Sequence, residues 1–132
     1  MANSRCGGDC RLLPTEKEKI AALAWEKLAP ALNDDLRIIQ SEVQQGVAQL
    51  IAWGDCEFFT VVRGETAANG KELVIVAAAG KNSVHYLETI HTQAKAQGFA
   101  SVRFHTKRPE AMLRMGKVLG YEKAETILRA VL

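Results

Sequence analysis

The stretch from Glu72 to Gly98 constrains the fold of this chain more than any other. It begins with Glu-Leu-Val-Ile-Val-Ala-Ala-Ala-Gly, an apolar run that is typical of a strand buried on both faces. A helical pattern follows, which either Asn82 or Ser83 can cap with a side-chain oxygen. A strand that leads into a helix N-terminus aims free amides and the positive end of the helix dipole at one point. The stretch therefore predicts an anion site.

The 132 residues predict a single domain over 14–132, preceded by a polar segment over 1–13. Hydrophobic residues make up 48% and charged residues 24%, as in ordinary soluble globular proteins. No apolar run is long enough to span a bilayer, and the N-terminal residues lack the apolar core of a signal peptide. We expect a cytoplasmic protein without a membrane partner.

Charge is distributed unevenly along the chain. Residues 16–57 carry eight acidic and four basic side chains, whereas residues 103–132 carry seven basic and three acidic ones. The dense basic region Arg103–Lys117 suits a solvated surface, a phosphate-bearing ligand or an acidic protein partner. No DNA-binding motif accompanies it, so specific nucleic-acid binding is not expected. The sequence leaves an oligomer open.

The cysteines do not predict a metal site. Cys6 and Cys10 form one close pair, and Cys56 lies far along the chain. Structural zinc needs four ligands, typically in two close pairs, and the second pair is missing. A disulfide between Cys6 and Cys10 stays open, although a reducing cytosol disfavours it. Cys56, at the start of a predicted strand, is interpreted as a small core residue.

Hydrophobic periodicity predicts the order helix, helix, strand, strand, helix, strand, helix, strand. The first helix opens with a Thr15–Glu18 capping box and is ended or bent by Pro30. The apolar stripe of the second helix runs from Leu36 to Ile51, with Gly46 inside it. The later elements are strands over 56–62 and 73–78, a helix from 83 to Gly98, a strand over 101–106, a helix from Pro109 to Gly120 and a strand over 124–132.

These elements predict a mixed sheet. The turn-rich segment 64–70 joins the strands over 56–62 and 73–78 as an antiparallel hairpin. The helix that starts at residue 83 separates two further strands, which makes those two strands parallel. The fold class is therefore α/β, with helices covering both faces of the sheet.

This running order resembles that of the GCN5-related N-acetyltransferases, whose fold is the acyl-CoA N-acyltransferase-like one. The resemblance covers residues 14–132, and its most specific part is C-terminal, where Ala111 and Gly120-Tyr121 fall at the spacing of a family motif. The sequence also resembles small phage and prophage members of the family. This resemblance implies a virion or morphogenesis role, and a virion location as an alternative to the cytoplasm. The implied cofactor is acetyl-coenzyme A.

The resemblance also implies a cofactor site between the strands over 73–78 and 102–106. Backbone groups of the first strand would hold the pantetheine arm, and amides of the turn would hold the pyrophosphate. The implied cofactor-binding residues are Val76, Ala77, Ala78, Gly80, Lys81, Asn82, Ser83, Val84 and Arg108, and the basic side chains Arg103, Lys107, Arg114 and Lys117 are further candidates for the phosphates.

The chain departs from the family pattern at the positions that carry chemistry. Ala79, Asn82 and Val84 replace the Gln or Arg, the Gly and the Gly or Ala of the phosphate turn. Arg108 replaces a family Asn, and Gly116 replaces the Tyr that often serves as general acid. A glycine cannot donate a proton to a thiolate. The departures predict a degenerate active site.

An acetyltransferase needs a base, or a water relay, to deprotonate the attacking amine. Glu57, predicted on the strand beside the central one, is the best candidate for a catalytic base. The other titratable candidates are His85, His91, His105 and Tyr121. The sequence favours a protein that has lost catalysis and serves in binding or assembly. The alternative is a small acetyl-coenzyme A-dependent N-acetyltransferase, with Glu57 or water as base and backbone amides polarising the thioester carbonyl.

Overall fold

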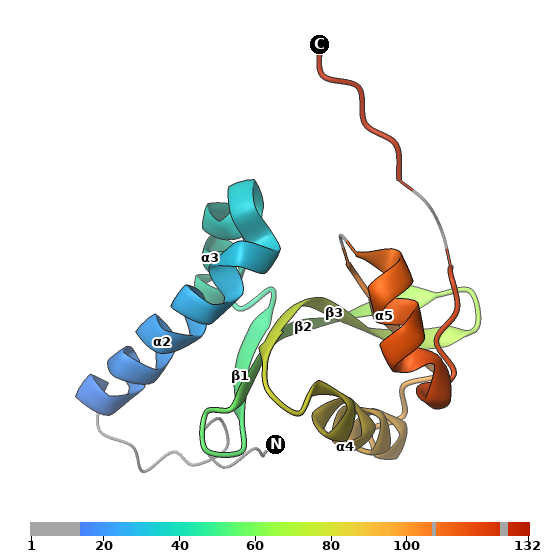
Figure 1. The fold of residues 1–132 in the computed structure, drawn as a ribbon, viewed down its shortest axis with the longest axis horizontal. Coiled ribbons are helices and arrows are strands. Elements are labelled where there is room, and N and C mark those ends of the chain that lie inside the picture. The colour runs from blue at the N-terminus through green and yellow to red at the C-terminus, as the bar shows by residue number, and fades with distance from the viewer. Residues whose placement is uncertain (1–13, 107, 125–126) are drawn as a thin grey trace.

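The structure is a computed structural model that describes residues 14–106, 108–124 and 127–132. In these ranges the chain forms a mixed α/β fold around one four-stranded sheet, with strand order β1-β2-β3-β4. Figure 1 shows α2 and α3 on one side of the sheet, and α4 and α5 on the other. The elements are α2 (Pro14–Leu32), the 3₁₀ turn η1 (Asn33–Asp35), α3 (Leu36–Gln44), β1 (Gln49–Trp53), β2 (Phe58–Ala67), β3 (Gly70–Gly80), α4 (Ser83–Ala96), β4 (Ser101–Phe104), α5 (Pro109–Gly116) and the 3₁₀ turn η2 (Lys117–Leu119).

The sheet contains both predicted pairings. β2 and β3 pair antiparallel through a tight turn, with Ala67 opposite Gly70. β3 and β4 pair in parallel, with α4 as the crossover between them. β1 adds an antiparallel strand to the outer side of β2. The prediction of a mixed α/β sheet with helices on both faces is confirmed.

Two apolar clusters hold the layers together, one on each face of the sheet. Leu28 of α2 and Ile39 of α3 pack over one face, where the strands contribute Phe59, Val61 and Ala77. Leu87 and Ile90 of α4 pack over the other face, where the strands contribute Ile51, Trp53, Phe58, Val62 and Ile75. The alternation of β2 side chains between the two clusters is that of a strand buried on both faces.

The helix predicted over 36–51 is wrong in its second half. α3 ends at Gln44, and Gly46 follows with φ +80°, a left-handed conformation that stops a helix. Leu50 and Ile51 instead lie in β1, opposite Val61 and Thr60 of β2. The apolar spacing fitted a helix, but pairing with β2 satisfies the backbone and buries the same side chains.

Several predicted boundaries also move. Cys56 lies in the β1–β2 turn with φ +62°, half-buried against the α2 side of the core, and β2 begins two residues later. Most of the predicted loop 64–70 belongs to β2 and β3. Pro30 neither ends α2 nor starts a new element, because α2 continues to Leu32. The predicted side-chain cap of α4 is absent, since Asn82 occupies the N-cap without a capping hydrogen bond.

The strand predicted over 124–132 does not form in the described residues, because 124 and 127–132 lie in neither a helix nor a strand. The observed order therefore has one more strand before β2 and, among the described residues, none after α5. Cys6, Cys10 and Lys107 lie outside the described residues. Within the described ranges, no helix combines the length and apolarity that crossing a membrane would need.

Candidate functional site

The two parallel strands part halfway along β3. Their pairing ends at Ile75 and Phe104, where the His105 N–H donates to the Ile75 carbonyl at 3.0 Å. β3 continues to Gly80, paired there only with β2 among the described residues. A bulge at Val76 coincides with the parting, since Val62 lies opposite Ile75 and Val61 opposite Ala77. Bulges re-aim a strand, so this one separates β3 from β4 and frees an edge of β3.

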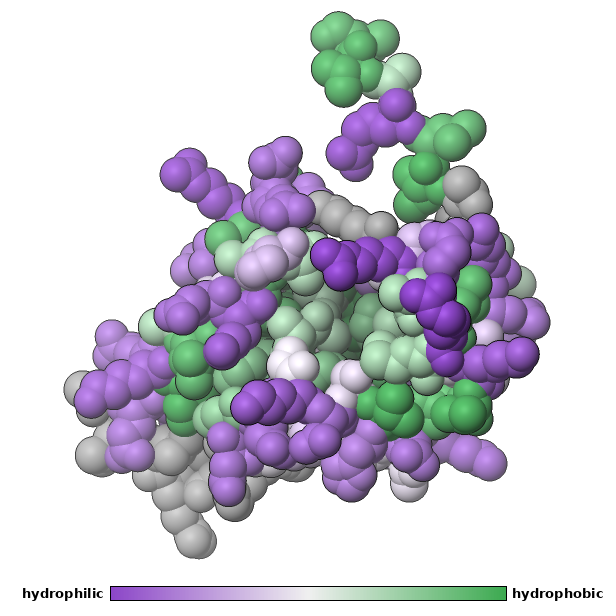
Figure 2. Space-filling model, in the orientation of Figure 1, coloured by the Kyte–Doolittle hydropathy of each residue, from purple (hydrophilic) through white to green (hydrophobic). Residues whose placement is uncertain are grey.

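Figure 2 shows a hollow in the molecular surface between α3 and α5, over the middle of the sheet. The residues that line the hollow are mainly weakly polar or apolar in colour, and strongly hydrophilic residues surround it. The sequence-predicted residues Val76, Ala77 and Ala78 belong to the part of β3 beyond the parting. Ala77 is buried and the other two are half-buried.

The turn after β3 is shaped by two residues with positive φ. Gly80 has φ +135°, and a Cβ at this position would overlap the carbonyl oxygen of Glu57. The Lys81 N–H donates to that same oxygen at 2.8 Å. Asn82 has φ +59°. Asn is among the non-glycine residues that adopt this conformation most readily, so Asn82 keeps a backbone shape for which glycine is otherwise preferred.

The N-terminus of α4 opens directly after this turn. The first-turn amides of a helix have no partner within the helix, and α4 has neither a side-chain cap nor an acidic residue in its first turn. Ser83 instead donates through Oγ to Sδ of Met115 in α5 at 3.1 Å. The half-buried Val84 follows, and Lys81 is exposed. The amides and the dipole are favourable for an anion, whereas the branched Val84 side chain narrows the approach.

Glu57 lies in the β1–β2 turn and not on β2. Its Oε1 accepts a hydrogen bond from the Tyr86 hydroxyl at 2.5 Å, and its Oε2 accepts one from Asn82 Nδ2 at 3.4 Å. The hydrogen bond to Glu57 is the main cause that raises the pKa of Tyr86. Glu57 therefore stands beside the Gly80 end of β3, at the opposite end of the open edge from Ile75.

A pocket of about 610 Å³ lies beside Glu57. Its walls carry two carboxylates, Asp55 and Glu57, and the His85 ring, which meets Tyr86 edge-on with a centroid distance of 5.0 Å. The remaining lining residues are Trp53, Gly54, Thr89 and Gln93. An acidic pocket of this kind is unfavourable for phosphate groups.

Tyr121 and His91 form a separate pair between α4 and the segment after η2. The Tyr121 hydroxyl and His91 Nε2 are 2.7 Å apart, and the Tyr121 ring packs edge-on to Phe104. Burial raises the pKa of Tyr121 to about 12 and lowers the pKa of His91. Gly116 is buried against the Tyr121 ring, so a side chain at position 116 would collide with it. These three residues pack together between α4, β4 and the segment after η2.

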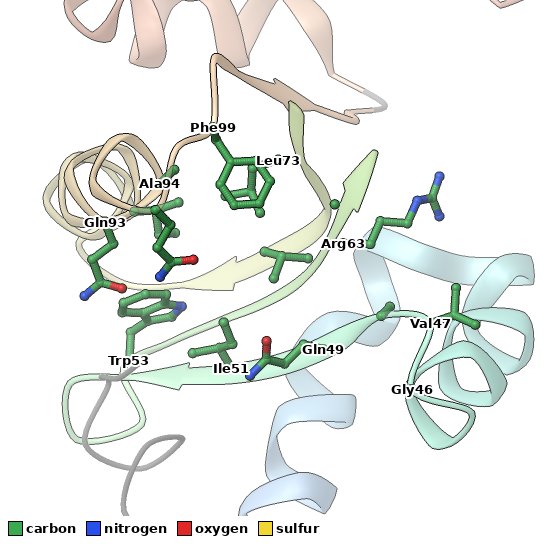
Figure 3. A pocket seen from close by; sticks show the side chains of 15 residues that line it. Gly46, Val47, Gln49, Ile51, Trp53, Arg63, Leu73, Gln93, Ala94 and Phe99 are labelled. Carbon is green, nitrogen blue, oxygen red and sulfur yellow. The ribbon is translucent and has the colours of Figure 1, made fainter. Parts of the chain in front are cut away.

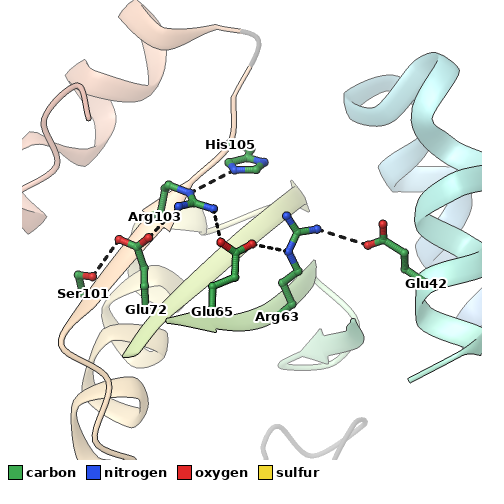
Figure 4. A network of polar contacts seen from close by, with 7 residues as sticks. All are labelled: Glu42, Arg63, Glu65, Glu72, Ser101, Arg103 and His105. Carbon is green, nitrogen blue, oxygen red and sulfur yellow. Dashed lines mark hydrogen bonds and ion pairs between the residues drawn. The ribbon is translucent and has the colours of Figure 1, made fainter. Parts of the chain in front are cut away.

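His105 and Arg103 belong to an ion-pair network that crosses the sheet from β4 to α3 (Figure 4). Arg103 donates to Glu72 at 2.9 Å, to Glu65 at 2.8 Å and to His105 Nε2 at 3.4 Å. Arg63 links Glu65 to Glu42 of α3, at 2.8 and 3.4 Å respectively. Arg63 and Arg103 hold the pKa of Glu65 below its usual value. Arg103 is thus engaged by carboxylates, which separates it from the rest of the basic region. Arg108, Arg114 and Lys117 are exposed.

A second pocket, of about 250 Å³, opens between α4 and the β1–β2 side of the sheet. Figure 3 shows Ile51, Trp53, Leu73 and Phe99 around it, with the amides of Gln49 and Gln93 at its rim. None of the nine predicted cofactor-binding residues lines either described pocket. Among the described residues, no group of three or more His, Cys, Asp or Glu side chains could hold a metal ion.

The chain shares its fold with solved structures of other proteins. Among solved structures, the chain is similar to one described as a probable acetyltransferase, with a TM-score of 0.59 and 10% identity over 87% of this chain and 91% of that one. It is also similar to TTHA1254 from Thermus thermophilus, with a TM-score of 0.51 and 13% identity over 83% and 91% of the two chains. No protein-family model and no curated protein matches the sequence.

Sequence reasoning missed three features of this site. The bulge at Val76 has no signal in an unbroken apolar run. The Glu57–Tyr86 contact joins residues 29 positions apart, which no local pattern predicts. The left-handed Asn82 could have been found, because Asn between a strand and a helix is a common signature of that conformation.

Proposed function

We propose that this protein binds acetyl-coenzyme A along the free edge of β3 and transfers the acetyl group to an amine. One observation carries the proposal: the β3–β4 pairing stops at Ile75, while β3 runs on to the uncapped N-terminus of α4. A free strand edge offers amides and carbonyls to the amide-rich pantetheine arm, and the helix N-terminus suits the pyrophosphate. Gly80 and Asn82 support the fit, because both keep the turn in the conformation that brings its backbone close to a ligand.

Each part of the edge would have its own task. Backbone groups of Val76 to Ala78 would bind the arm, and the amides of Ser83 and Val84 would bind phosphate. Lys81, and Arg108 at the start of α5, would add positive charge. Bound there, acetyl-coenzyme A supplies an activated thioester. Because Glu57 stands at the phosphate end of the edge, we assign removal of the amine proton to water and not to this carboxylate.

The test is calorimetric titration with acetyl-coenzyme A, paired with a thermal-shift measurement. Cofactor at about 1,000 times its Kd should stabilise the protein by about 4 kcal/mol. Val84→Asp should abolish the binding, because its carboxylate repels phosphate, yet an acidic residue in the first helical turn favours the fold. Thr92→Asp, at an exposed position further along α4, is the matched control and should bind normally. No binding by the wild type, or unchanged binding by Val84→Asp, would refute the proposal.

A second candidate function is binding or assembly without catalysis. It is favoured by the positions of the acid and base groups: Tyr121 is tied to His91, His105 to Arg103, and Glu57 to Tyr86. The basic surface of Arg108, Arg114 and Lys117 would then serve an acidic partner. Thiol release from acetyl-coenzyme A with a panel of amines separates the two functions. Cofactor binding without any release supports the second, and release that survives Glu57→Gln supports transfer with water as base.

A further inference from the structure

A groove lies between α4 and β1, on the face of the sheet that α4 covers. The two described pockets form it, and they adjoin because both have Trp53 and Gln93 in their walls. Figure 3 shows these two side chains together at one end of the smaller pocket. On the helix side, the lining residues have the spacing of one helical face: Tyr86, Thr89, Ile90, Gln93 and Gln97. Three turns of α4 make this α4–β1 groove about 16 Å long.

The two ends of the α4–β1 groove differ in chemistry. The walls of the smaller pocket are mainly apolar, with Ile51, Val62, Leu73, Ile90 and Phe99. Arg63 also lines it, but its guanidinium is paired with Glu42 and Glu65. The larger pocket has the exposed carboxylates of Asp55 and Glu57 in its wall, and none of the described residues that line it is Lys or Arg. The groove is therefore apolar at one end and negatively charged at the other.

The Glu57 carboxylate is held in place at the charged end. The Tyr86 hydroxyl donates to its Oε1 at 2.5 Å, and Asn82 Nδ2 donates to its Oε2 at 3.4 Å. Gly54 makes room for that hydroxyl, because a Cβ at this position would overlap it. The Tyr86 ring is itself stacked on Phe58, with a centroid distance of 5.7 Å. Each carboxylate oxygen can accept two hydrogen bonds, so Glu57 can bind a further N–H without being reordered.

We propose that the α4–β1 groove binds an organic cation with an apolar body, of the class of primary amines that carry an apolar chain or ring. The ammonium group lies between Asp55 and Glu57, where it gains charge-assisted hydrogen bonds and the nearby aromatic ring of Tyr86. The body extends past Trp53 into the apolar pocket, where its burial is favourable. The groove shares none of the nine predicted cofactor-binding residues, so this site does not rest on the proposed acetyl transfer.

The first test is calorimetric titration of the full chain with phenylbutylamine at neutral pH, compared with its uncharged counterpart phenylbutanol. The amine should bind at least tenfold more tightly, because only its ammonium group can pair with the carboxylates. Asp55→Asn and Glu57→Gln should each weaken amine binding about tenfold, the value of one charge-assisted hydrogen bond. Glu88→Gln is the matched control: it removes the same charge from an exposed position of α4 that lines neither pocket, and should bind normally.

A second pair of variants locates the ligand. Gln93→Lys puts a positive charge where the two pockets meet and should abolish amine binding. Thr92→Lys adds the same charge at the neighbouring exposed position, outside both pockets, and should leave it unchanged. The chain has two tryptophans, so Trp25→Phe leaves Trp53 as the only one. Its fluorescence should change as the amine binds.

Three results overturn the proposal. The absence of both heat and fluorescence change at millimolar amine shows that the groove does not hold the cation. Equal affinity for phenylbutanol, or an equal loss in Glu88→Gln, shows that Asp55 and Glu57 do not contact the ammonium group. Displacement of the amine by acetyl-coenzyme A places the amine in the opening beside β3. Circular dichroism checks the fold of each variant, and the comparison of amine with alcohol on the unchanged chain decides if a variant does not fold.

Discussion

Gly80 lies directly against the backbone of Glu57, so closely that a Cβ on Gly80 would overlap the Glu57 carbonyl oxygen. The two residues join the end of β3 to the β1–β2 turn, and the neighbouring Lys81 amide completes the contact at 2.8 Å. The backbone of the proposed phosphate turn is therefore held by the β1–β2 turn, which lies at the same end of the sheet.

The first prediction concerns this contact. Gly80→Ala should destabilise the fold by about 3 kcal/mol, because it adds a steric overlap to the strain of a positive φ. Gly98→Ala is the matched control: Gly98 also has a positive φ, but no atom lies within 4 Å of the position that a Cβ would take there. It should lose only about 1 kcal/mol. Urea unfolding measures both, and equal losses would contradict the contact.

The second prediction concerns Val84. Its branched side chain stands beside the first-turn amides of α4, where a ligand phosphate would approach. Val84→Ala should tighten acetyl-coenzyme A binding about tenfold, which is about 1.4 kcal/mol. Calorimetric titration measures the change, with the exposed Val118→Ala as control. Unchanged affinity in Val84→Ala would place the phosphates elsewhere.

The third prediction follows from the half-buried His91–Tyr121 pair. Burial lowers the pKa of His91 below its ordinary value of 6.5, so the unfolded chain binds a proton more readily than the folded one. Stability should therefore fall as the pH decreases through and below 6.5, by at most about 1.4 kcal/mol per pH unit. Urea unfolding at several pH values measures this slope. His91→Gln should flatten it, and an equally steep slope in that variant would assign the effect to other groups.

The same pair makes a prediction that does not depend on pH. Tyr121→Phe removes the hydroxyl and keeps the ring against Gly116 and Phe104. The loss should be about 1 kcal/mol, the usual net value of one hydrogen bond, with some cost for the unpaired His91 nitrogen. A neutral substitution would show that water replaces the hydroxyl.

The fifth prediction concerns Glu57 and Tyr86. The pKa of Tyr86 is raised mainly by its hydrogen bond to the Glu57 carboxylate, so Glu57→Gln should lower it towards the ordinary value of 10. The chain has two tyrosines, so a Tyr121→Phe background leaves Tyr86 as the only one that titrates. Absorbance of the tyrosinate against pH measures the shift. A pKa that does not move would mean that the contact is absent in solution.

Local sequence patterns located most of the secondary structure, because those elements depend on neighbouring residues. The apolar run over 73–78, the glycines at 98 and 120 and Pro109 mark β3, α4 and α5 correctly. The same reasoning failed at β1, where Leu50 and Ile51 suit either a helix or a strand. There the left-handed conformation of Gly46 ends α3, and pairing with the edge of β2 stabilises these residues as a strand.

The candidate site divides in the same way. Residue patterns alone predicted that a buried strand leads into a helix N-terminus, and that Val84 and Gly116 depart from the pattern of the family that the sequence resembles. The three-dimensional arrangement was needed to show that β3 and β4 part at Ile75, that Asn82 takes the left-handed conformation, and that Glu57 faces Tyr86. Whether the edge of a strand is free depends on how far the neighbouring strand pairs with it. Contacts between residues that are distant in the chain have no local sequence signature. For the same reason, the residue types over 124–132 predicted a strand that does not form in the described residues. A strand also needs a neighbouring strand to pair with, and the described residues of this segment have none.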